Sequence, residues 1–215
     1  MRGRVRLRYL LSLLTAATLS ACQLLPGADR PSFVDGYPAF PDADPTSALF
    51  HFVVEIPAGT NDKWEVDKET GGLHWEEKDG RPRVVQYLAY PGNYGMIPST
   101  TLPEAIGGDG DPLDVLLLGP ALERGSVVVA RPIGVLRLLD GGERDDKILA
   151  VREEGPLSDV RNLSMLDARY AGARTIIETW FTSYKGPGKM TSDGFGDAEE
   201  ALAVIREASR HFLER

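Results

Sequence analysis

Three carboxylates fall within six residues in the segment Asp109–Asp114, which reads Asp-Gly-Asp-Pro-Leu-Asp. Carboxylates this close repel one another unless a cation neutralises them, and their oxygens suit Mg²⁺, Mn²⁺ or Ca²⁺. Solvated turns are also rich in Asp and Gly, so the segment alone leaves metal binding and a plain surface turn both open. An EF-hand calcium loop is excluded, because Leu113 and Pro120 occupy the fifth and twelfth positions, which require oxygen ligands.

A second acidic turn spans Asp140–Lys147 and contains Asp140, Glu143, Asp145 and Asp146. By itself this segment reads as a hairpin loop between two strands. Like the first cluster, it lies between strand-like runs, and the strand ends at one mouth of a barrel can converge. Two such turns facing each other could hold several divalent ions.

Basic and phenolic side chains are interleaved with these acids along the chain. A site that combines carboxylates with cations suits a highly charged phosphate substrate, because metals and Lys or Arg bind its oxygens. Each of these side chains taken singly fits a solvated surface charge or half-buried packing equally well. They are Lys63, Arg83, Arg131, Lys147, Lys185, Tyr90, Tyr94 and Tyr184.

The elements that must position these groups are strands first and helices last. Apolar and polar residues alternate over 50–56, and again over 63–67, where Lys63, Glu65 and Asp67 share one side. Short strands separated by Gly- and Asp-rich turns predict a small closed β-barrel in a mainly β protein with some α. Further strand-like runs are 84–88, 115–118, 126–139 (interrupted by Pro132 and Gly134) and 147–151.

Two C-terminal helices are predicted to pack on this barrel. In the first, Ile177, Phe181 and Tyr184 recur at helical spacing, Ile176 and Trp180 widen the same apolar face, and 186–188 (Gly-Pro-Gly) ends the helix. In the second, Asp197 and Glu200 predict a capping box for a helix that runs through Leu213.

The N-terminus reads as an export signal. Four arginines within residues 2–8 precede a short apolar stretch and the sequence Leu-Ser-Ala-Cys, which ends at Cys22. This ending resembles the bacterial lipoprotein box, in which the cysteine is lipidated. We therefore expect a signal peptide over 1–21, a lipidated cysteine and flexible Pro-rich tether over 22–46, and a folded domain over 47–215. The protein is then expected in the cell envelope or periplasm, with membrane contact only through its lipid anchor.

Composition excludes several classes of protein. The 215 residues hold 42% hydrophobic and 26% charged side chains, which are globular values, and the formal net charge is −8. A single cysteine cannot form an internal disulfide or a zinc site built on several thiolates. The acidic balance argues against a nucleic-acid-binding barrel, which needs a basic groove.

Seven ordered segments resemble the soluble family I inorganic pyrophosphatases. The acidic segment 109–114 is similar to the family's signature, and the resemblance covers about residues 50–190. The other segments are 54–57 (Val-Glu-Ile-Pro), 63–68 (Lys-Trp-Glu-Val-Asp-Lys), 90–95 (Tyr-Pro-Gly-Asn-Tyr-Gly), 131–134 (Arg-Pro-Ile-Gly), 140–147 and 184–185 (Tyr-Lys).

This resemblance implies an OB-like five-stranded barrel that hydrolyses pyrophosphate to two phosphates with several Mg²⁺ ions, for which Mn²⁺ could substitute. It implies that Asp111 orients or deprotonates the attacking water. Metal ligands by position are Asp109, Asp114, Asp140, Asp145 and Glu55. Residues expected to hold phosphate oxygens are Lys63, Arg83, Tyr94, Lys147, Tyr184 and Lys185, and Glu65 and Tyr90 are expected to line the site.

Some alternatives stay open at this point. The hairpin over 76–82 is longer than in compact bacterial relatives, so Arg81 competes with Arg83 for the substrate contact. We expect a homo-oligomer, although the sequence does not give its subunit number. A catalytically silent lipoprotein that binds metal or phosphate is the second functional reading, and an OB-type nucleic-acid module is the third.

Overall fold

The computed structural model describes residues 31–103, 107–108 and 110–215. Asp109, Cys22 and the signal peptide predicted over residues 1–21 therefore lie outside the described residues. What is described forms one compact unit that runs from Pro31 to Arg215.

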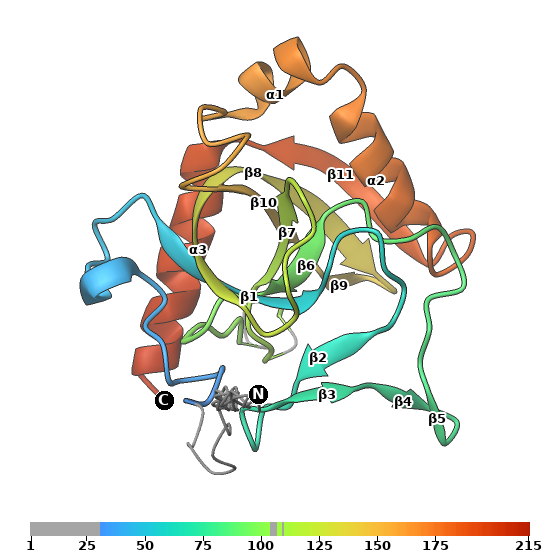
Figure 1. Cartoon of the computed structure of the whole chain (residues 1–215), viewed down its shortest axis with the longest axis horizontal. Coiled ribbons are helices and arrows are strands. Elements are labelled where there is room, and N and C mark those ends of the chain that lie inside the picture. Colours follow the sequence, from blue (N-terminus) through green and yellow to red (C-terminus); the bar gives the residue numbers. More distant parts are fainter. Residues whose placement is uncertain (1–30, 104–106, 109) are drawn as a thin grey trace, which may run out of the picture. The chain divides into compact units, whose positions relative to one another are not determined.

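Five strands close into the predicted barrel (Figure 1). Their order around the ring is β1 (Phe50–Ile56), β6 (Asn93–Met96), β7 (Asp114–Leu118), β10 (Lys147–Arg152) and β8 (Val127–Asp140). The ring closes because β1 pairs with β6 along one part of its length and with β8 along another. Only β7 and β10 run parallel among these pairs. The small closed β-barrel expected from the short strands and the Gly- and Asp-rich turns between them is confirmed.

Shorter elements extend and cover this ring. Within the described residues, no helix is both long and apolar enough to cross a membrane. The remaining elements are a 3₁₀ turn η1 (Pro41–Ala43), the hairpin β2 (Trp64–Val66) with β3 (Leu73–Trp75), the hairpin β4 (Glu77–Lys78) with β5 (Arg81–Pro82), β9 (Glu143–Arg144) and β11 (Met190–Gly196), which both pair with β8, and the helices α1 (Leu163–Arg169), α2 (Ala173–Ser183) and α3 (Ala198–Leu213).

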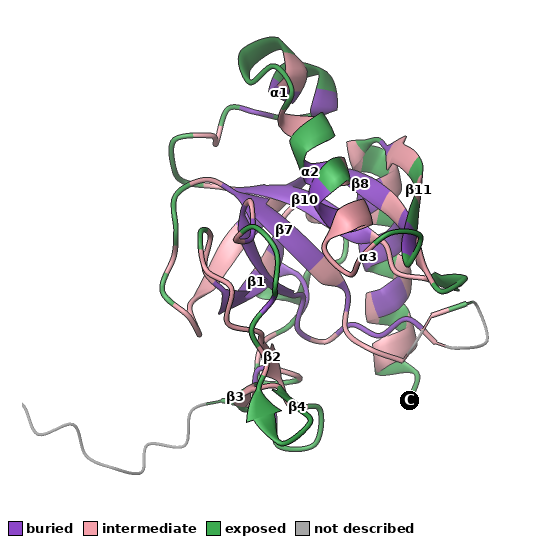
Figure 2. Ribbon diagram, turned by 90° about the vertical axis from the view of Figure 1, so that its right-hand side faces the viewer, coloured by how far each residue is buried: buried purple, intermediate pink, exposed green. Residues whose placement is uncertain are grey.

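Successive residues of the ring strands pack into two different cores. In β7, Leu117 packs in a core that includes Ile205 of α3, whereas its neighbour Leu116 packs with Trp180 and Phe181 of α2. Figure 2 shows the resulting band of buried residues through β1, β7, β10 and α3. Each fully buried Leu side chain contributes roughly 1.5–3 kcal/mol of transfer free energy, so burial on both faces holds the strands that carry the site.

Two strand predictions were wrong. β8 is one continuous strand through Pro132 and Gly134, because the register with β10 shifts between Leu149 and Ala150 at that point. Such a bulge accommodates a residue that has no N–H to donate. Conversely, residues 84–88 form no strand, and Val84 makes only an isolated bridge to Asp62.

The two predicted C-terminal helices are present as α2 and α3, and the short helix α1 before them was not predicted. Ile176 was assigned to the apolar face of α2 but is 63% exposed. Asp197 caps α3 by accepting from the Glu200 N–H at 2.9 Å. The Glu200 carboxylate binds Arg137 of β8 rather than completing the capping box.

The boundary between tether and domain also differs from the expectation. Residues 31–46 were assigned to a flexible tether, yet the compact unit begins at Pro31, not Ser47. Phe33 and Phe40 are buried, and the Phe33 N–H donates to the Gly71 carbonyl at 2.8 Å. A few large apolar side chains therefore fold this Pro-rich segment onto the barrel, although it has no periodic pattern of its own.

Candidate active site

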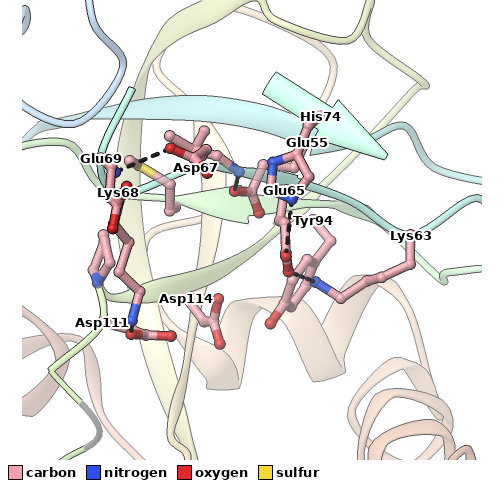
Figure 3. Close-up of a pocket in the computed structure, with 13 residues that line it drawn as sticks. Glu55, Lys63, Glu65, Asp67, Lys68, Glu69, His74, Tyr94, Asp111 and Asp114 are labelled. Carbon is pink, nitrogen blue, oxygen red and sulfur yellow. Dashed lines mark hydrogen bonds and ion pairs between the residues drawn. The ribbon is translucent and has the colours of Figure 1, made fainter. Parts of the chain in front are cut away.

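A cavity of about 530 Å³ is bordered by strands β1, β2, β3 and β6 and the segment that leads into β7. Figure 3 shows side chains from these elements converging on it. Alternation along β1 and β2 brings Glu55, Lys63 and Glu65 to its wall. The lining residues are Glu55, Lys63, Glu65, Val66, Asp67, Lys68, Glu69, His74, Tyr94, Met96, Asp111, Pro112 and Asp114.

A second cavity, of about 410 Å³, has a basic lining. Four cationic side chains face it, with Asp140 as the carboxylate among its lining residues. It is bordered by the β4–β5 hairpin, the end of β8 and the segment that follows α2. The lining residues are Lys78, Arg83, Val84, Val85, Gln86, Asp140, Tyr184, Lys185 and Lys189.

Glu55 is a buried carboxylate at the first cavity, with 5% of the residue exposed. It accepts a hydrogen bond from the Val66 N–H at 2.7 Å. Burial raises the pKa of Glu55 to about 7, Lys63 opposes this shift, and the nearby Asp114 carboxylate adds to it. Negative charge is therefore costly at this position, and a cation beside Glu55 would relieve that cost.

Lys147 of β10 joins two of the predicted metal ligands. Its side chain is 2% exposed, and its Nζ donates to Asp114 Oδ2 at 2.5 Å and also to Asp145. Burial alone would lower the pKa of Lys147, but the two carboxylates outweigh it and hold that pKa above its usual value. Burial also raises the pKa of Asp145, with Lys147 opposing it and Asp114 adding to it. The ammonium group thus compensates part of a concentrated negative charge.

Two further predicted acids are also paired with lysines. Lys185 Nζ donates to Asp140 at the second cavity. Lys68, from the turn after β2, forms an ion pair with Asp111 across the first cavity (Figure 3). Each of these acids therefore has a lysine as its charge partner, although the first cavity is mainly acidic and the second mainly basic.

The predicted tyrosines form one aromatic group around Trp180 of α2. The Trp180 ring lies 4.4 Å from Tyr90 and stacks on Tyr184 at 4.6 Å, and Tyr90 lies 5.2 Å from Tyr94. Burial raises the pKa of each of these three phenols, so they stay protonated at neutral pH and can donate hydrogen bonds. The Tyr94 ring also lies 5.8 Å from Lys63 Nζ and 5.9 Å from Lys147 Nζ, which places it between two of the cations.

Arg83 faces the second cavity, whereas its competitor Arg81 is exposed on β5. Glu76 holds Arg83 with two hydrogen bonds, at 2.6 and 2.8 Å, and its carboxylate also lies 3.9 Å from Lys63 Nζ. The sequence interpretation gave Glu76 no role. The register of the β4–β5 hairpin could have predicted this contact, because the pairs Glu77–Pro82 and Lys78–Arg81 place Glu76 opposite Arg83.

The structure brings most of the predicted residues to these two cavities. Glu55, Lys63, Glu65, Tyr94, Asp111 and Asp114 line the first, and Arg83, Asp140, Tyr184 and Lys185 line the second. Lys147 and Asp145 join the set through Asp114, and Tyr90 joins it through its ring contacts. Asp109 lies outside the described residues. Among the described residues, no three Asp, Glu, His or Cys side chains are gathered closely enough to hold a metal ion as they stand.

Comparison with known proteins decides the family. A family profile described as "Pyrophosphatase: Inorganic pyrophosphatase" matches residues 52–213, which is most of the chain. The chain belongs to the inorganic pyrophosphatase family. This membership confirms the family resemblance seen in the seven sequence segments.

Individual pyrophosphatases agree with this assignment. An inorganic pyrophosphatase of Synechocystis is 33% identical over 175 residues, which are 79% of this chain and 95% of that protein. One from Gluconobacter oxydans is 38% identical over 160 residues, covering 73% and 87%. The type I inorganic pyrophosphatase of Toxoplasma gondii has a similar crystal structure, with a TM-score of 0.78, 32% identity and coverage of 86% and 88%. The predicted OB-like fold is confirmed by these neighbours.

Proposed function

We propose that this chain hydrolyses inorganic pyrophosphate to two orthophosphate ions in a reaction that depends on Mg²⁺. Family membership supports the reaction class. The observation that carries the proposal is a mainly acidic cavity and a basic one linked through Glu76, whose carboxylate contacts Lys63 of the first and Arg83 of the second. A strongly anionic substrate needs both cations for its own oxygens and carboxylates for the metals that accompany it.

The described carboxylates fit divalent metal. Burial raises the pKa of both Glu55 and Asp145, and the Asp114 carboxylate raises both further, so negative charge is crowded in poorly solvated surroundings. Hard oxygen donors of this kind suit Mg²⁺, with Mn²⁺ as a possible substitute. The residues that would hold the ions are Glu55, Asp114, Asp140 and Asp145, together with Asp109.

Mg²⁺ bound there would make the attacking water more acidic and offset charge on the phosphate oxygens. Asp111 lies at the wall of the acidic cavity, where its carboxylate can orient that water and accept its proton. Lys63 and Arg83 would bind the phosphate oxygens, and the protonated Tyr94 and Tyr184 would donate to them. Lys185 lies at the basic cavity, where it would stabilise charge that grows on the departing phosphate.

The decisive experiment measures orthophosphate released from pyrophosphate by the purified protein. We expect release with excess Mg²⁺, none after treatment with EDTA, and recovery when Mg²⁺ is restored. The competing reading is a silent lipoprotein that binds metal or phosphate. It would retain labelled pyrophosphate in equilibrium dialysis without releasing any orthophosphate, and that result would overturn the proposal.

We also propose that the protein is exported and anchored through lipidated Cys22. The order of the N-terminal residues supports this location: four arginines, a short apolar stretch and then Leu-Ser-Ala-Cys. An exported pyrophosphatase would recover phosphate from pyrophosphate outside the cytoplasm. Labelled palmitate should enter the wild-type protein and not the Cys22→Ser variant. Cytoplasmic protein that retains Met1 would contradict the proposal.

A further inference from the structure

The hairpin formed by β2 and β3 carries site residues but is not part of the barrel sheet. It forms a separate two-stranded sheet, in which Trp64 pairs with Trp75 and Val66 pairs with Leu73. Lys63 at its start faces the first cavity. No strand ladder joins this hairpin to the ring, so its connection to β1 depends on side chains, among them Glu55, which accepts from the Val66 N–H of β2.

The two tryptophans of the hairpin stack on each other. Their ring centroids lie 5.6 Å apart with an interplanar angle of 26°, and both residues are half-buried. Trp75 Nε1 donates to the Arg83 carbonyl at 2.8 Å, and the Lys63 N–H donates to the same oxygen at 3.0 Å. The Arg83 carbonyl oxygen therefore accepts from both the stacked Trp75 and the Lys63 backbone. Arg83 and Lys63 are both predicted to bind phosphate oxygens.

Arg124 closes the other end of the stack. It lies in the turn between β7 and β8, where the neighbouring Gly125 N–H donates to the Val54 carbonyl of β1 at 2.8 Å. Its guanidinium carbon lies 4.4 Å from the Trp64 ring centroid, within the range of a cation–π contact. Its Nε donates to the Glu55 carbonyl at 3.0 Å. One planar group thus contacts both the barrel strand and the Trp64 ring of the stack.

These contacts form a continuous series from the barrel to the phosphate ligands. Glu55 of β1 is linked to Arg124, Arg124 to the two stacked rings, and the second ring to the Arg83 backbone. The planar fork of Arg makes both contacts at once, which the ammonium of Lys cannot do. Displacement of a substrate-positioning group by about 1 Å lowers the efficiency of an enzyme by up to about 100-fold.

We propose that Arg124, acting through the stacked Trp64 and Trp75, is a positioning residue that sets Lys63 and Arg83 against the barrel for binding the phosphate groups. The proposal rests on the proposed pyrophosphate hydrolysis. It assigns Arg124 no contact with substrate. Loss of the Arg124 side chain should therefore raise KM more than it lowers kcat, because Lys63 and Arg83 would bind phosphate oxygens both before and during the reaction.

The test compares Arg124→Met with Arg137→Met, whose arginine is also half-buried but pairs with Glu200 of α3. With Mg²⁺ in excess, Arg124→Met should raise KM for pyrophosphate by about 10-fold and change kcat by less than about 3-fold. Arg137→Met should leave both values near wild type. Arg124→Lys should behave like Arg124→Met, whereas Trp64→Phe, which keeps an aromatic ring under the guanidinium, should retain a nearly normal KM.

A spectroscopic readout separates positioning from general stability. The chain has three tryptophans, so a Trp180→Phe background leaves only the stacked pair. The exciton-coupled circular dichroism of that pair should weaken when Arg124→Met is added and persist when Arg137→Met is added. Arg124→Lys keeps the charge and serves as the milder variant if Arg124→Met does not fold.

Two outcomes would overturn the proposal: a normal KM in folded Arg124→Met and Arg124→Lys, or a raised KM with an unchanged dichroism signal. The second would mean that Arg124 acts independently of the rings. If wild-type protein released no orthophosphate at all, the proposed function would be wrong, while the dichroism experiment would still report whether Arg124 orders the stack.

Discussion

Lys147→Met removes an ammonium group from the most enclosed ion pairs of the site. Methionine keeps an unbranched side chain of similar length but leaves Asp114 and Asp145 without their shared cation. The Lys147 side chain is 2% exposed, against 30% for Asp114 and 19% for Asp145, so water can compensate only in part. Removal of one partner from a buried ion pair destabilises proteins by about 3–5 kcal/mol.

That loss is large enough to measure directly. For a protein of this size, 1 kcal/mol corresponds to about 2–4 °C in Tm, so we expect Tm to fall by roughly 6–20 °C. The assay is calorimetric unfolding at neutral pH in EDTA. Added Mg²⁺ should raise the Tm of Lys147→Met more than that of wild type, because a divalent ion can replace the missing positive charge between the two carboxylates.

Lys68→Met is the matched control. Lys68 also pairs with a site carboxylate, but its side chain is 57% exposed and that of Asp111 is 44% exposed. Exposed ion pairs contribute only about 0–1 kcal/mol, so its Tm should change little. If Lys147→Met lost no more stability than Lys68→Met, burial would not make the Lys147 ion pairs more stabilising than an exposed pair, and the reasoning would fail.

Three further substitutions test other parts of the structure. Asp111→Asn should fold and bind metal normally but lose at least about 100-fold in kcat, and near-normal turnover would show that Asp111 is not the general base. Gly95→Ala should destabilise the barrel by about 3 kcal/mol in urea unfolding, since an added Cβ would lie 1.9 Å from the Val53 carbonyl oxygen, and an unchanged midpoint would contradict this. The hydrogen bond from Arg137 lowers the pKa of Glu200 below its usual 4.5. This ion pair is half-exposed, so it contributes under about 1 kcal/mol to the free energy of unfolding. That stabilisation is present above pH 4.5 and is lost as the pH falls through the lowered pKa. Glu200→Gln should therefore differ from wild type in Tm at pH 7 but converge with it at acidic pH, and a constant difference would refute the assignment.

The barrel was predictable because its strands carry recognisable apolar patterns. Phe50–Ile56 alternates with a period of two, whereas the runs within 114–118 and 147–151 are short and continuously apolar, and each of the three is a ring strand. Tertiary packing decided the rest. Pro132 predicted an interruption of β8, but a shift in the pairing of β8 with β10 lets the strand continue through it, and Ile176 fits the helical period yet remains outside the core.

Tertiary packing also decided the structure of the N-terminal segment, which is folded where the sequence pattern predicted a tether. Prolines and the absence of periodicity predicted a tether up to residue 46, but Phe33 packs with Val53 and Met96, and Phe40 is buried beside β1 residues such as Phe50. Two aromatic side chains bury enough area to fold a segment that has no regular secondary structure. A local pattern cannot reveal this, because the partners lie on β1 and β6.

The sequence indicated which residues belong to the candidate site, but not which of them form ion pairs with one another. The spacing of the acids and their resemblance to a family signature pointed to the carboxylates as candidate metal ligands, whereas the lysines were predicted only as phosphate ligands. The structure gives these lysines a second role: Lys147 joins Asp114 to Asp145, and Lys185 holds Asp140, 45 residues away. Metal ions bound to these carboxylates would compete with the lysines for acceptor sites on the same oxygens, and would leave ammonium N–H groups able to donate to phosphate. The lysines that compensate the acids without metal would then supply part of the positive charge that binds the substrate, which is consistent with acids and lysines lying side by side in one site.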